Sequence, residues 1–242
     1  MVLRAMAGGL VVACALMSGC GDPAEGDVVT QYEIGEEAIR AGDALAIRNT
    51  YSTETVAWME DVLRCCREAS VAQTKALDPS KMEMVVMLRN RVDAAALKAM
   101  DVTGLIRWEL DMDMFFVDAD MDVYPHSVEI QGDRAVMQMG VKPERSASLR
   151  MGGGRRGRGV RAIGSIAGMV MQPGLEPIPG WTNDFVLLDG FWYADLVSEM
   201  GDYDDSIRAD AKSAGKSVPD YIAEMEKEAH GSLRPTVWNP VR

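Results

Sequence analysis

Two short turn signals, each between apolar runs, constrain the fold of this chain most. The apolar runs are 128–130 and 135–139 around Gly132-Asp133, and 185–188 and 191–196 around Asp189-Gly190. Gly and Asp accept the positive φ of two-residue hairpin turns, so each signal predicts two antiparallel strands joined directly. Because residues before 100 instead follow helical spacing, we predict an α+β fold. N-terminal helices pack on a curved, mostly antiparallel sheet, and a C-terminal helical tail follows.

The N-terminal half predicts several helices. Apolar positions from Glu33 to Thr50 indicate a first helix, and Ser52 or Thr53 can cap a second that runs to about Ala76. A short helix is expected at 93–100, opened by its acid, and a last one ends near Gly231. Between them, residues 109–123 alternate apolar and acidic side chains in two phases, which predicts strands separated by a bulge or turn.

Cysteine use favours a structural role for two thiols. Cys65 and Cys66 are adjacent on the apolar side of the second predicted helix, next to Leu63. Neighbouring helix positions point about 100° apart, which does not suit joint metal ligation. We expect two small apolar core residues, with a redox or metal role as the alternative.

The first twenty residues resemble the signal of bacterial lipoproteins. Arg4 gives a positive start, an apolar stretch follows, and the run Met17-Ser18-Gly19-Cys20 is similar to a lipobox. The resemblance implies cleavage before Cys20 and a diacylglyceryl group on its thiol. The stretch is shorter than the roughly 20 apolar residues that a membrane span needs. The alternative is an ordinary secretory signal, cut near Ala15 or Gly19.

This signal sets the expected organisation of the chain. We predict a signal peptide at 1–19, an extended acidic tether at 20–32, an α+β domain at 33–200 and a C-terminal helical extension at 201–242. The protein is then expected in the cell envelope, held to a membrane by the lipid on Cys20. In such lipoproteins a second-position Asp favours inner-membrane retention. Gly21 occupies that position here, which favours the outer membrane.

Charge excludes one class of partner. The formal net charge of −12 becomes −13 once Arg4 leaves with the signal. A protein that binds nucleic acid needs a basic face to displace counterions from phosphates, so we expect no nucleic-acid partner. The partner is instead expected to be a small ligand or an envelope protein.

The segment 185–196, with sequence FVLLDGFWYADL, is similar to the closing hairpin of the SnoaL-like α+β cone fold. The resemblance covers roughly residues 33–197. It implies a curved sheet that wraps a long helix, and a pocket between helix and sheet. Relatives include binding modules, isomerases and dehydratases, and the enzymes usually place a His or an Asp in the pocket.

Aromatic and titratable side chains are the candidate residues of such a pocket. Aromatic side chains that could line a cone pocket are Trp58, Trp108, Trp181, Trp192 and Tyr193. Asp184 and Asp195, which flank the second hairpin, and His126 are the candidate acids or bases. The alternative is purely structural: the aromatic side chains belong to the core and His126 lies in a turn. No cofactor is predicted.

One acidic pattern suggests calcium. Asp118, Asp120 and Asp122, with Glu129 at the twelfth place, match the oxygen-ligand spacing of an EF-hand loop. The loop's glycine position holds Val123, and Pro125 follows, so the pattern departs from that motif. A simpler explanation is a strand in which the acidic side chains alternate with apolar ones and lie on the solvent-exposed face.

Three functions remain from the sequence. The leading prediction is a lipid-anchored binding or interaction module without catalysis, because no nucleophile and base share a recognisable motif. A small pocket enzyme of the isomerase or dehydratase kind is the first alternative. A calcium-stabilised envelope domain is the second.

Overall fold

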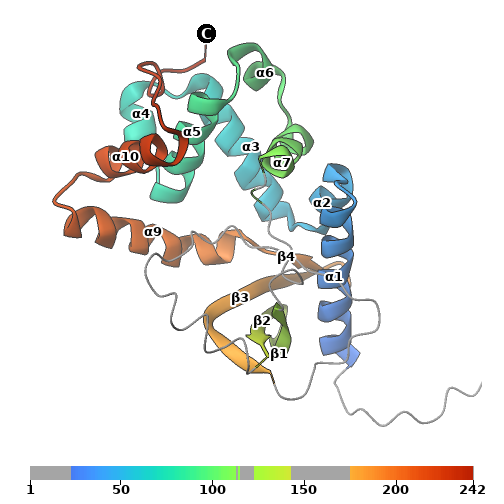
Figure 1. The fold of residues 1–242 in the computed structure, drawn as a ribbon. Helices are drawn as coiled ribbons and strands as arrows, with labels where there is room; N and C mark the ends of the chain where they lie inside the picture. Colours follow the sequence, from blue (N-terminus) through green and yellow to red (C-terminus); the bar gives the residue numbers. More distant parts are fainter. Residues whose placement is uncertain (1–22, 113, 115–122, 143–174, 242) are drawn as a thin grey trace, which may run out of the picture.

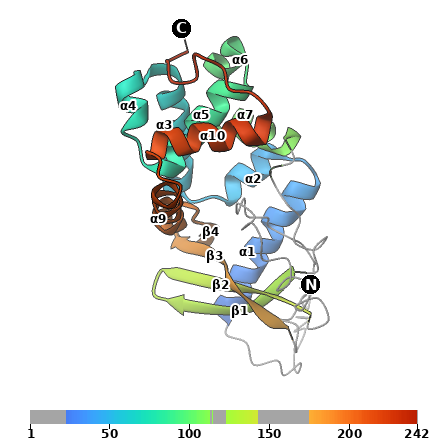
Figure 2. The same ribbon diagram turned by 60° about the vertical axis from the view of Figure 1, so that its left-hand side comes forward.

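The computed structural model describes residues 23–112, 114, 123–142 and 175–241. Helices pack against a four-stranded antiparallel sheet with strand order β1-β2-β3-β4, so the predicted α+β class is confirmed for the described residues. Figures 1 and 2 show the sheet at one end of the molecule and most helices at the other. The cone-like wrapping of a helix by the sheet stays a prediction.

Both predicted hairpins are confirmed. The strands are β1 (Val123–Gln131), β2 (Arg134–Val141), β3 (Glu176–Leu188) and β4 (Phe191–Ala194). The φ of Gly132 is +66° and that of Gly190 is +83°, as two-residue hairpin turns require. β3 begins nine residues before its predicted start at 185, so it pairs with β2 along most of its length.

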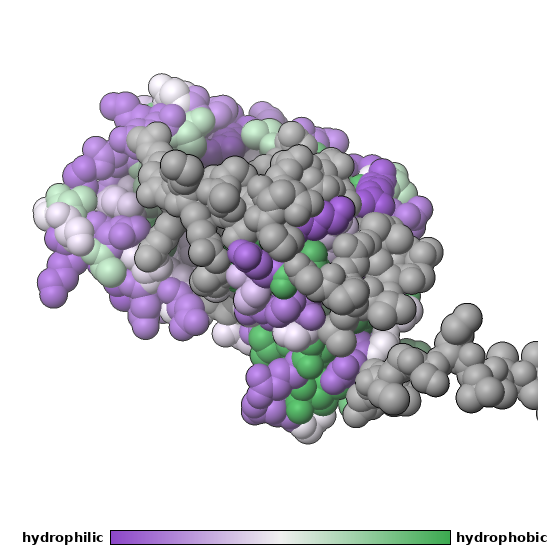
Figure 3. All heavy atoms as spheres, turned by 60° about the horizontal axis from the view of Figure 1, so that its bottom comes forward, coloured by the Kyte–Doolittle hydropathy of each residue, from purple (hydrophilic) through white to green (hydrophobic). Residues whose placement is uncertain are grey.

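The sheet presents one face to the core and one outward. Ala135 and Met137 of β2 are buried in the main core, whereas Val136 between them is 41 % exposed. Figure 3 looks toward this end of the molecule and shows apolar side chains among polar ones. Val136 pairs with Asp184 of β3, so the outward face mixes apolar and charged residues.

The first helix corrects two predictions. α1 (Pro23–Arg40) occupies most of the segment that was expected to be an extended tether. Val28, Val29 and Tyr32 lie on one face of α1 and are buried in the main core, which stabilises the helix despite its acids. The single helix expected at 33–50 is also wrong, because Gly42 (φ +64°) breaks it and Asp43 caps the separate α2 (Ala44–Thr50).

The second predicted helix begins as expected and ends early. Ser52 caps α3 (Thr53–Glu68) by accepting a hydrogen bond from the Thr55 amide. The chain then becomes extended at Ala69, because Ser70 forms a capping box with Gln73 and starts the short α4 (Val71–Lys75). The predicted run to Ala76 is therefore two helices.

The next three helices confirm one predicted N-cap and replace part of a predicted strand. α5 (Pro79–Arg91) contains an apolar run at 82–88 that only Glu83 interrupts, and Asp93 caps α6 (Ala94–Ala99) as predicted. The strand expected from Glu109 is wrong at its start, because Glu109 belongs to α7 (Val102–Asp111). Its spacing with Val102, Leu105 and Ile106 is helical, and all four are buried.

The C-terminal helices form a second core with α5. They are α9 (Val197–Ser213), which begins before the predicted boundary at 201, and α10 (Val218–His230), which ends at Gly231 with φ +78°. The buried residues of this core are Met82, Val86, Ile207, Ile222, Met225 and Val237. Val237 lies beyond α10, so the last segment packs into the fold as a strap.

Buried Arg89 ties α3, α4 and this strap together. Its guanidinium donates to the carbonyls of Cys65, Cys66 and Ala69 at 2.8–3.0 Å, and more weakly to that of Val237 at 3.5 Å. The first three carbonyls lie at the C-terminal end of α3, where a cation is favourable. The two thiols beside it are free and buried, as expected, and burial raises the pKa of Cys66 to about 12.

Candidate functional site

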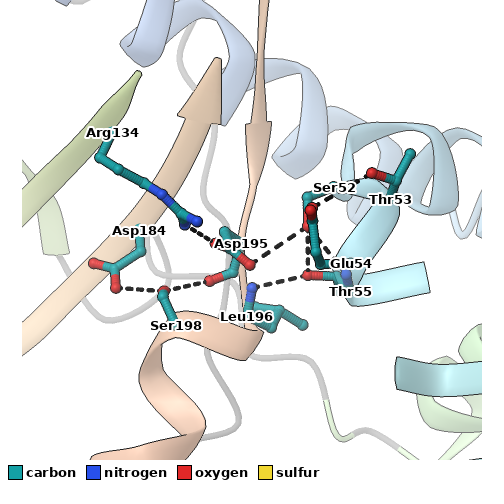
Figure 4. Close-up of polar contacts among 9 residues, drawn as sticks. All are labelled: Ser52, Thr53, Glu54, Thr55, Arg134, Asp184, Asp195, Leu196 and Ser198. Atoms are coloured by element: carbon teal, nitrogen blue, oxygen red, sulfur yellow. Dashed lines mark hydrogen bonds and ion pairs between the residues drawn. The ribbon is translucent and has the colours of Figure 1, made fainter. Parts of the chain in front are cut away.

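Two of the predicted catalytic residues belong to a polar joint between the helices and the sheet (Figure 4). Tyr51 forms a β-bridge with Ala194, and the Ser52 amide donates to the Ala194 carbonyl at 2.8 Å. The next residue, Asp195, is 3 % exposed. Its carboxylate accepts from the Ser52 hydroxyl at 3.4 Å and forms an ion pair with Arg134 of β2.

Asp184 is held in the same joint by α9. The Ser198 hydroxyl lies 2.6 Å from the Asp184 carboxylate and 2.8 Å from the Asp195 carbonyl. On the other side of the joint, the Leu196 amide donates to the Thr55 hydroxyl at 3.0 Å. The partners of both carboxylates thus bind neighbouring elements together, which describes a structural joint better than an acid–base pair.

We predict that Asp195→Ala lowers the free energy of unfolding by about 1–3 kcal/mol, because it leaves the buried Ser52 hydroxyl without this acceptor and removes the Arg134 ion pair. Asp184→Ala is the matched control and should cost less, because Asp184 is only partly buried. Chemical denaturation of both variants measures the difference. Equal stability of Asp195→Ala and wild type would contradict a structural joint.

His126 does not meet the two aspartates. Its Cβ lies against Gly140 of β2, where an added side chain would approach to 2.9 Å. Asp184 is paired with Val136, four residues back along β2, which corresponds to about 13 Å along the strand. The predicted set of Asp184, Asp195 and His126 is therefore not assembled into one site.

Helix α7 carries a buried acid that the sequence analysis missed. Burial raises the pKa of Glu109 from its ordinary value of 4.5 to about 8. Tyr51 is also buried, and both burial and the nearby Glu109 raise its pKa. The helical spacing of Glu109 with Val102, Leu105 and Ile106 is the signal that could have revealed this burial.

An open groove lies where α2, α3 and α7 converge near the end of α6. Its volume is about 390 Å³, at the low end of the range for small-ligand sites. Its lining residues are Arg48, Glu60, Leu63, Arg67, Ala99, Met100, Asp101, Val102 and Thr103. They come from separate helices, so no local sequence pattern could have joined them.

The predicted pocket aromatics lie elsewhere. Trp192 is buried in the main core, and Trp58, Trp108 and Trp181 are partly buried against it. Tyr193 is half-buried on β4, opposite Val186. None of them lines the groove between α3 and α7.

The predicted calcium and lipid sites fall largely outside the described residues. Asp118, Asp120, Asp122 and Cys20 lie there, whereas Glu129 is exposed on β1 and accepts a hydrogen bond from Gln131 at 2.8 Å. In the part of the chain that the structure describes, no three His, Cys, Asp or Glu side chains gather as metal ligands. No described helix has the length and apolar character to cross a membrane.

Comparison with protein families, with curated proteins and with solved structures gave no match to this chain.

Proposed function

We propose that this protein is a lipid-anchored module of the bacterial cell envelope that binds a ligand or a partner outside the cytoplasm. One observation carries the proposal: Met17-Ser18-Gly19-Cys20 directly follows a short apolar stretch that begins after Arg4. Acylation of Cys20 with two or three chains would give stable attachment, because each buried CH₂ contributes about 0.8 kcal/mol.

The fold supports a close attachment with a defined orientation. α1 begins at Pro23, so only Gly21 and Asp22 separate it from Cys20. Three Cα steps reach at most about 11 Å, which holds the start of α1 close to the lipid surface. α1 is about 27 Å long and leads from the sheet end toward α2 (Figures 1 and 2). The groove near α7 would then lie at the far end of α1 from the lipid attachment.

Labelling with radioactive palmitate tests the anchor. We expect wild type to incorporate the label and Cys20→Ala to incorporate none. Cys14→Ala is the matched control and should label normally, because Cys14 lies inside the predicted signal peptide. Equal labelling of wild type and Cys20→Ala would contradict the proposal.

Fluorescence quenching by lipid-borne spin labels tests the orientation. Asp27 of α1 and Ala95 of α6 are both exposed, so each can be replaced by a cysteine that carries a fluorophore. Cys65 and Cys66 should react little, because both are buried and burial raises the pKa of each thiol. We predict strong quenching at position 27 and little at 95. The reverse pattern, or equal quenching, would contradict the orientation.

A further inference from the structure

The groove where α2, α3 and α7 converge is lined by two arginines from different helices. Arg67 of α3 is fixed in place, because its Nε donates to the Leu63 carbonyl at 2.9 Å and its Nη1 to the Lys98 carbonyl at 3.4 Å. These two bonds engage only part of the guanidinium, which has five N–H donors. The remaining donors have no partner among the described residues, and Arg67 lines the groove.

Arg48 of α2 is the second cation of the groove. It is half-buried, and among the described residues its side chain has no hydrogen-bond or ion-pair partner. A partly desolvated guanidinium without an acceptor gains more from an anion than one that is fully hydrated. Arg48 therefore adds a reason for the groove to bind an anionic group.

The acids of the groove limit which anion it can accept. Asp101 already caps α7, with its Oδ1 2.7 Å from the Gly104 amide, and Glu60 is exposed on α3. The two carboxylates offset the charge of the two guanidiniums, so selectivity among anions must come from directed hydrogen bonds, and a planar carboxylate accepts these in pairs from a guanidinium. Met100 is half-buried and gives the groove an apolar surface, whereas Leu63 is 1 % and Val102 is 4 % exposed.

We propose that this groove binds a small ligand through a single carboxylate, held by Arg48 and Arg67, with an apolar body against Met100. Planar guanidinium and carboxylate groups match in a two-bond geometry, which gives direction as well as affinity. The proposal deepens the binding role proposed above and rests on it for the ligand's source outside the cytoplasm. The groove chemistry does not depend on the lipid.

N-acetyl-leucine and N-acetyl-leucinamide form a matched pair of probes, because only the first carries a carboxylate. The full-length acylated protein in detergent micelles is titrated with each, and the methyl resonance of Met100 reports binding in the groove. We expect N-acetyl-leucine to shift this resonance and the amide to bind at least tenfold more weakly. Inorganic phosphate should also bind more weakly than N-acetyl-leucine.

Variants locate the carboxylate. Arg48→Ala should weaken N-acetyl-leucine binding at least tenfold, whereas Arg64→Ala should not change it, because Arg64 lies outside the groove and pairs with Asp61 on the exposed side of α3. Arg67→Lys keeps the charge but loses the planar geometry and should weaken binding.

Equal affinity for the acid and the amide, unchanged binding by Arg48→Ala, or tighter binding of phosphate would overturn the proposal. If Cys20→Ala protein binds N-acetyl-leucine with wild-type affinity, the groove proposal stands even when the lipid anchor is disproved. The two proposals can therefore fail separately.

Discussion

Replacing Glu226 with alanine is expected to lower the free energy of unfolding by about 3–5 kcal/mol, the largest loss that we predict for a single side chain. Glu226 of α10 is 5 % exposed. Its carboxylate accepts hydrogen bonds from Arg91 at 2.6 and 2.8 Å and from Asn90 at 2.6 Å. Without Glu226, the largely buried Arg91 guanidinium would lose its counter-charge.

The same substitution should loosen the C-terminal strap. Asn90 also donates to the Ser232 carbonyl at 3.0 Å and accepts from the Arg234 amide at 2.8 Å. Chemical denaturation measures the stability, and limited proteolysis after residue 230 reports the strap. Glu224→Ala is the control on the same helix, because Glu224 makes an exposed pair with Lys216 and should cost about 1 kcal/mol or less. A Glu226→Ala loss no larger than this would contradict our account of the second core.

Glu109→Gln is expected to remove a pH-dependent loss of stability. Burial raises the pKa of Glu109 to about 8, whereas in the unfolded chain it ionises near 4.5. Below pH 4.5 the carboxyl is protonated in both states, so it opposes folding least there. As pH rises from 4.5 to 8, Glu109 ionises in the unfolded state but not in the folded one, so the free energy of unfolding falls. Above pH 8 the carboxyl ionises in both states and the free energy of unfolding falls no further from this cause.

The contribution of Glu109 is isolated by subtracting the free energy of unfolding of wild type from that of Glu109→Gln at each pH. We expect this difference to rise by about 3–5 kcal/mol from pH 4 to pH 9, since one pKa unit corresponds to about 1.4 kcal/mol. Denaturant unfolding across this pH range measures it. A flat difference for Glu109→Gln would show that the buried carboxyl ionises normally in the folded protein.

The sequence predicted the elements whose cause is local. The turns at Gly132-Asp133 and Asp189-Gly190 need particular backbone angles, and Ser52 and Asp93 supply cap acceptors within three residues. These features depend on near neighbours, so a single sequence reveals them.

The features that the sequence did not predict depend on contacts between segments that are distant in the chain. Acidic residues suggested that α1 would be extended, yet packing of Val28, Val29 and Tyr32 against the core overrides that composition. Asp195 flanks a predicted hairpin, but its partners Ser52 and Arg134 come from the N-cap of α3 and from β2. The groove likewise joins α2, α3 and α7, which no local pattern connects.

The lipid anchor is the central claim, and the intact mass of the protein extracted from membranes tests it most directly. We predict a chain that begins at Cys20, with added mass equal to a diacylglyceryl group, alone or with a third acyl chain on the new amino terminus. A chain that begins at Met1, or a cleaved chain without added lipid mass, would contradict the account.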